Sequence, residues 1–140
     1  MYRDMNSNLG AITSLAPAVR TADADGAGVD LQGADSATII VNVGAVTGTV
    51  NATSAVVLEE SDDNSTFTDV ADADILGTEP TSYAAATAYQ FGYIGSMRYV
   101  RATHVKGGET NAATSAVVVK GNLHTAPSAQ SNAAPTYSGT

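Results

Sequence analysis

The stretch that decides the fold is Val56–Val70, with the sequence VVLEESDDNSTFTDV. Its apolar run meets four acidic residues and Asn64, and the apolar pattern restarts at Phe67. Asp and Asn side chains cap their own backbone in tight turns, so the stretch predicts two strands joined by a hairpin turn. A calcium site is the alternative, because it needs several carboxylates in one short loop. An extended strand sends Glu59 and Glu60 to opposite faces, which favours the turn.

Similar short strands are expected on both sides of this hairpin. β-branched residues alternate with polar ones, Gly, Asp and Asn separate the segments, and no window has a capped helical stripe. Ala71–Leu76 and Tyr83–Ala88 could form a helical turn at best. The pattern predicts an all-β protein, a single β-sandwich (Ig-like or jelly-roll-like) of about seven to eight short, mainly antiparallel strands. The expected strands are Ala11–Val19, Gly28–Leu31, Ser36–Val43, Ser54–Ser61, Thr66–Val70, Ala88–Ile94, Arg98–Val105 and Thr114–Lys120.

Two of these segments are apolar on both faces. Ser36–Val43 (SATIIVNV) should be a central strand, and Thr114–Lys120 (TSAVVVK) should lie beside it or opposite it across the core. Arg98–Val105 has no clean apolar face, and we expect Val100 and Ala102 to point inward.

Three aromatic residues, Tyr89, Phe91 and Tyr93, recur at every second position and share one face of a strand. They could form a sugar-stacking platform or a protein-binding stripe. The chain has only six Tyr, two Phe and no Trp, so we expect them to supply bulk to the core.

Asp23–Asp30 superficially resembles a calcium loop. Aligned to the EF-hand spacing from Asp23, it has Ala27 at the fifth loop position, which should carry a ligand, and Ala34 at the twelfth, where a bidentate Glu is required. We interpret it as a mobile acidic hairpin turn.

The composition narrows the possible functions. The net charge is −8 and the six basic residues are scattered, which disfavours nucleic acid and anionic membranes as partners. There is no cysteine, and no secretion signal or membrane span is evident, so we expect a soluble protein made in a cytoplasm. The only histidines are His104 and His124, and no nucleophile-elbow motif accompanies them. We therefore predict no catalytic residue, no cofactor and no metal site, and a non-enzymatic protein.

The length of 140 residues suits one domain. We expect an N-terminal arm at residues 1–10, a β-sandwich at 11–120 and a low-complexity C-terminal arm at 121–140. The C-terminal arm has no charged residue and little to bury, so it cannot repay its ordering entropy alone. A neighbouring subunit or a partner should order it.

Several phrases together resemble small structural proteins of tailed bacteriophages that are encoded near the major capsid protein. They are GVDLQGADSATIIVNVGAVTG (Gly28–Gly48), LEESDDNSTFTDVADADILG (Leu58–Gly77), GYIGSMRYVRAT (Gly92–Thr103) and SAVVVKGNLHTAP (Ser115–Pro127). The resemblance implies a β-rich virion protein, a head decoration or cement protein made in the host cytoplasm and located on the capsid surface. Its partners would be the major capsid protein and copies of itself, in a possible trimer.

This resemblance makes the arms the expected contacts, because extended ends can lie on neighbouring subunits. Met1–Asn8 and Gly121–Thr140 are the expected segments. The candidate interface residues are Met1, Tyr2, Arg3, His124, Pro127, Pro135 and Tyr137. Alternative functions are a neck, tail or fibre component of the virion, or a carbohydrate- or calcium-binding β-module.

Overall fold

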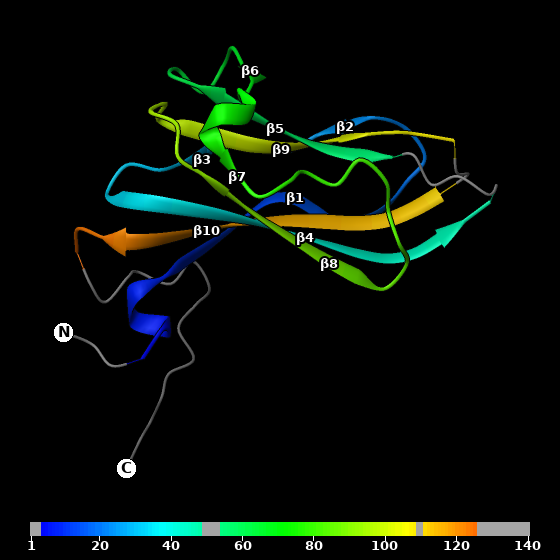
Figure 1. Cartoon of the computed structure of the whole chain (residues 1–140), viewed down its shortest axis with the longest axis horizontal. Helices are drawn as coiled ribbons and strands as arrows, with labels where there is room; N and C mark the ends of the chain where they lie inside the picture. The colour runs from blue at the N-terminus through cyan, green and yellow to red at the C-terminus, as the bar shows by residue number, and fades with distance from the viewer. Residues whose placement is uncertain (1–3, 49–53, 109–110, 126–140) are drawn as a thin grey trace.

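The computed structural model describes residues 4–48, 54–108 and 111–125, which form two antiparallel sheets packed face to face (Figure 1). Sheet A has the strand order β1-β10-β4-β8-β7, and sheet B has the order β2-β9-β5-β6 with β3 also paired to β9. The strands of sheet A are β1 (Gly10–Arg20), β10 (Asn111–Leu123), β4 (Ala34–Thr47), β8 (Thr87–Tyr93) and β7 (Ile75–Leu76). Those of sheet B are β2 (Ala24–Asp25), β3 (Val29–Asp30), β9 (Tyr99–Val105), β5 (Ala55–Ser61) and β6 (Thr68–Asp69).

One hydrophobic core fills the space between the sheets. Ile39 and Val118 of sheet A and Leu58 and Val100 of sheet B have no exposed surface, and they belong to a single cluster of buried residues. Full burial of each such side chain is worth about 1.5–3 kcal/mol. The fold is therefore the predicted all-β sandwich.

The centre of sheet A is the pair β4 and β10. Ile39 lies opposite Val118, so the two doubly apolar segments are neighbours in one sheet and do not face each other across the core. Both strands are longer than expected, because β4 continues through Gly44. The register shifts between Ala112 and Thr114, and a bulge there accommodates the glycine that the sequence suggested as a strand end.

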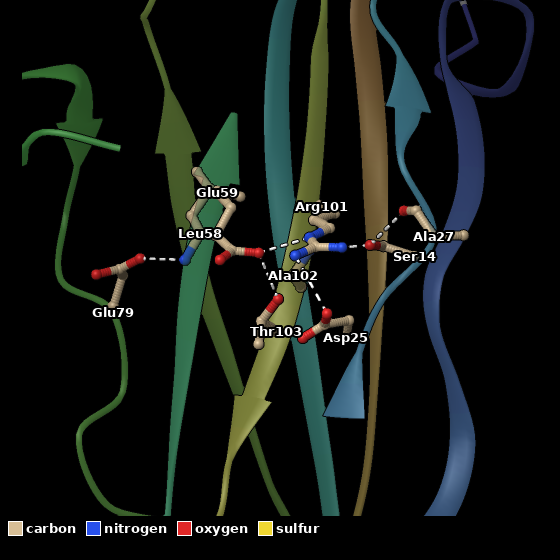
Figure 2. Close-up of polar contacts among 9 residues, drawn as sticks. All are labelled: Ser14, Asp25, Ala27, Leu58, Glu59, Glu79, Arg101, Ala102 and Thr103. Carbon is tan, nitrogen blue, oxygen red and sulfur yellow. Dashed lines mark hydrogen bonds and ion pairs between the residues drawn. The ribbon is translucent and has the colours of Figure 1, made fainter. Parts of the chain in front are cut away.

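Ser14 joins the two sheets at the β1 side of the sandwich. It is buried where the register of β1 shifts, its hydroxyl donates to the carbonyl of Ala27 over 2.9 Å, and it accepts the amide of Ala102 over 2.9 Å (Figure 2). The backbone carbonyl of Ser14 also accepts the amide of Ala27 over 2.7 Å. The Ser14 side chain thus forms hydrogen bonds with backbone groups that are not paired between neighbouring strands.

The interpretation of Asp23–Asp30 as a hairpin turn is wrong. Both β2 and β3 run antiparallel to β9, and so residues 24–30 form one edge strand with a bulge. Gly26 donates its amide to Ala102, and a Cβ on Gly26 would lie 2.6 Å from the hydroxyl oxygen of Ser14. The glycine that looked like turn punctuation lets the bulge approach β9 and β1 closely.

Other local predictions are confirmed. Val100 and Ala102 point inward and have no exposed surface. Phe91 and Tyr93 are buried, and Tyr89 packs against the core as a half-buried side chain. The acidic segment after the hairpin forms one 3₁₀ turn at Asp72–Asp74.

Regular structure extends into both predicted arms. A 3₁₀ turn, η1 (Asn6–Asn8), precedes β1. β10 continues to Leu123, three residues into the segment predicted as the C-terminal arm.

Candidate interaction site at one end of the sandwich

The first and last long strands meet at one end of the sandwich. Gly10, where β1 begins, lies opposite Lys120 near the end of β10, and Leu123 lies opposite Ala34, where β4 begins. η1 contacts β10 at this end as well. The polypeptide segments that precede β1 and follow β10 therefore start side by side (Figure 1).

An open cavity of about 490 Å³ lies at this end. Its walls are the start of β4 with the preceding loop, and the segment between β8 and β9. Asp30 and Arg98 form an ion pair with an N–O distance of 2.8 Å, and the Lys120 ammonium donates to the carbonyl of Asp30 over 3.2 Å. The hydrogen bond from Arg98 is the main cause that lowers the pKa of Asp30.

Tyr93 fixes the shape of the segment between β8 and β9. Its hydroxyl donates to Glu60 over 2.6 Å and accepts the amide of Met97 over 3.0 Å. Burial, followed by the bond to the carboxylate, raises the pKa of Tyr93 above its ordinary value, and so the phenol is neutral at physiological pH. A Cβ on Gly95 would collide with the Tyr93 ring, 2.6 Å away, which explains the glycine. Contacts with Tyr93, a residue of the core, therefore fix this part of the cavity wall.

His124 is the predicted contact residue that the structure describes. Its Nε2 lies 2.7 Å from Oδ1 of Asp35, a residue of the cavity wall, and its amide donates to the carbonyl of Gly33 over 2.8 Å. Both side chains of the pair are exposed. The other candidates lie outside the described residues: Met1, Tyr2, Arg3, Pro127, Pro135 and Tyr137.

The acidic stretch after β5 is the predicted turn. Oδ1 of Asp63 accepts the amides of Ser65 and Thr66, each over 2.9 Å, and the Ser61 hydroxyl donates to it over the same distance. These backbone bonds lower the pKa of Asp63, because they stabilise its ionised form. Asn64 has a φ of 59°, a left-handed conformation that suits Asn in a turn. The Asp63 carboxylate thus bonds to its own loop, as expected for the predicted turn.

Sequence reasoning missed a polar cluster on the outer face of sheet B (Figure 2). Arg101 makes ion pairs with Glu59 over 2.5 Å and with Asp25 over 3.2 Å, and its guanidinium lies 4.3 Å from the centre of the Phe67 ring. The Thr103 hydroxyl donates to the same Glu59 oxygen over 2.8 Å. Glu59 lies opposite Arg101 in the sheet register, a relation that is visible only once the strands are paired. The cluster ties β2, β5, β9 and the acidic turn together.

A carboxylate also caps the outer edge of β5. Oε1 of Glu79 accepts the amide of Leu58 over 2.5 Å, between two backbone bonds in which Val70 donates to Leu58 and Val56 donates to Pro80. Burial is the main cause that raises the pKa of Glu79. The segment after β6 therefore covers an edge that β6 leaves unpaired.

The two histidines have different surroundings. His104 has no exposed surface, and its Nδ1 lies 3.0 Å from the hydroxyl oxygen of Tyr83, whereas His124 is exposed. In the described part of the chain, no group of three or more His, Cys, Asp or Glu residues is placed to hold a metal ion. Within residues 4–48, 54–108 and 111–125, no helix is both long and apolar enough for a membrane crossing.

Comparisons of the chain with protein-family models, with curated proteins and with solved structures find no match.

Proposed function

We propose that this protein is a non-enzymatic structural component of a phage virion, a decoration or cement protein that bridges and stabilises major capsid subunits. The observation that carries the proposal is the geometry of the chain ends. Gly10 and Lys120 lie opposite each other on neighbouring strands, beside an open cavity with a wall fixed by Tyr93. The resemblance of the four sequence phrases to phage structural proteins supports the same conclusion.

This arrangement suits a protein that holds neighbouring subunits together. A rigid sandwich gives two terminal segments a common starting point, and both segments can then contact the same neighbouring surface. Such contacts must bury enough area to offset the loss of rigid-body freedom and the ordering of the segments. The sandwich lowers this cost, because β1 and β10 already fix where each segment starts.

The use of the polar and aromatic groups also supports a structural role. Arg101 and Glu59 hold strands together, and Asp63 holds its own turn. Phe91 and Tyr93 are buried in the core, which argues against the sugar-stacking platform considered from the sequence.

The test is reconstitution of expanded heads that lack the protein. Added full-length protein should bind at a copy number close to that of the capsid subunits, and should raise the resistance of the heads to heat and osmotic shock. A copy number of about a dozen would instead place the protein in a neck ring. Heads that are equally resistant with and without bound protein would refute the cement role.

A matched pair of variants tests the binding end. Ser96→Arg places a large cation at the cavity wall, and Ala85→Arg places the same side chain at an exposed position near the opposite end, where the amide of the adjacent Ala86 bonds to Gly44. The first change should weaken head binding and the second should leave it unchanged. Equal binding by both variants would show that the cavity end is not the contact.

A further inference from the structure

The outer face of sheet A differs from the rest of this acidic protein. Among the described residues, no outward position on β1, β10, β4, β8 or β7 holds a charged side chain, as the register against the buried inward positions shows. Lys120 and Asp35, the charged residues of β10 and β4, lie at inward positions. We call this surface the neutral face; its centre is formed by Thr13, Val117, Val119, Thr38, Ile40 and Gln90.

Three aliphatic side chains, Val117, Val119 and Ile40, lie among uncharged polar ones at the centre of the neutral face. Thr13, Val117, Ile40 and Gln90 lie opposite one another across four strands, and Val119 and Thr38 form the adjacent row. Ile40 is 36% exposed, and Thr13 and Gln90 are exposed too. In an antiparallel sheet, the residues on the solvent-exposed face are usually polar. The second apolar face that the sequence showed in β4 and β10 is thus not covered by any strand of the described part of the chain.

We propose that the neutral face is a contact between two copies of this chain, packed sheet on sheet about a two-fold axis. The net charge limits which faces of two copies can meet. Two copies with a charge of −8 each repel one another, and a close approach through sheet B would bring its acidic residues together. The neutral face lets two copies meet without burying like charges, and a two-fold axis makes one patch complementary to itself.

The size of the neutral face predicts a weak dimer. Five strands spaced ~4.8 Å apart, with roughly nine residues of ~3.3 Å each along them, give a face of about 20 by 30 Å. Two such faces bury about 1,200 Å² in total, the lower limit for a specific interface. Aligned sheets pack about 10 Å apart, which the small and β-branched side chains of this face permit.

Sedimentation equilibrium of the full-length protein, from micromolar to millimolar concentration, tests the proposal. We expect a monomer–dimer equilibrium that tightens when salt is raised, because salt screens the repulsion between the two acidic copies. A monomer at every concentration would overturn the proposal, and so would a trimer, because three copies cannot share one two-fold face.

A matched pair of glutamate variants locates the contact. Ile40→Glu should raise the dimer Kd by about tenfold or more, because the axis brings two new negative charges together. Val105→Glu is the control, since Val105 is a β-branched strand residue of sheet B with 39% exposure, close to the 36% of Ile40. Circular dichroism checks that both variants fold. Equal dissociation constants for the two variants would place the contact elsewhere. Because the purified protein suffices, the result does not depend on the proposed role on phage heads.

Discussion

Replacement of Ser14 by Ala tests how the two sheets are joined. The change removes one oxygen atom and leaves two backbone groups without their partner: the amide of Ala102 and the carbonyl of Ala27, each 2.9 Å from the hydroxyl. Ser14 is 4% exposed, which limits the access of replacing water. A buried group left unsatisfied costs about 1–3 kcal/mol, which applies in full to the buried Ala102 amide and only in part to the carbonyl of the exposed Ala27. We therefore expect the variant to lose about 2–3 kcal/mol of unfolding free energy.

Urea unfolding followed by circular dichroism measures this loss. With a slope of about 1.5 kcal/mol/M, a loss of 3 kcal/mol lowers the midpoint by about 2 M. Thr13→Ala is the control, because Thr13 is the exposed neighbour on the same strand. Hydrogen exchange of the Ala102 amide gives a local measurement, and its protection should fall in the Ser14 variant. A midpoint shift no larger than that of Thr13→Ala would refute the assignment of Ser14 as the joint between sheets.

Three further outcomes follow from the two edges of sheet B. Gly26→Ala should destabilise more than Gly28→Ala in urea unfolding, because the new Cβ at 26 meets a backbone carbonyl of β9, whereas at 28 it meets the movable end of Asn64; the reverse order would contradict this reasoning. Glu79→Ala should lose about 1–2 kcal/mol, because the Leu58 amide loses its acceptor; an unchanged midpoint would show that the edge needs no cap. Glu79→Gln keeps an acceptor without the charge, so at pH 7 it should be at least as stable as the wild type. Burial raises the pKa of Glu79 in the fold, so ionised Glu79 destabilises the folded state at pH 7, and this penalty disappears as pH falls towards 4.5. The urea midpoints of the wild type and Glu79→Gln should therefore lie closer together at pH 5 than at pH 7. A larger difference between them at pH 5 would contradict the expected sign.

Much of the fold could be predicted from local patterns. The alternation in Arg98–Val105 was weak, yet Val100 and Ala102 point inward as expected, because the strand has no other pair of small apolar residues to bury. The acidic turn was also predictable, since Asp63 needs only its own loop to satisfy its side chain. β2 and β7 were missed because each has only two residues and lies in a segment whose residues favour a turn.

The candidate sites were harder to predict, because each joins residues distant in sequence. Arg101 binds Glu59 and Asp25 across two strand pairs, and Ser14 meets Ala102 across 88 positions. Nothing in the local pattern distinguishes Ser14 from the other serines of the chain. The bulge at Gly26 shows the same limit, since glycine marks a turn and a close backbone approach equally well.

The sequence by itself determined that this chain forms short antiparallel strands, where its tight turn lies and which residues enter the core. Those properties depend on alternation and on backbone conformation, which act over a few residues. Only the tertiary structure decided that Ile40 and Val117 share an uncharged outer face, and that the start of β1 lies beside the end of β10. The physical reason is strand order: pairing between distant segments places side chains together, and the free energy of that pairing comes from the whole sandwich.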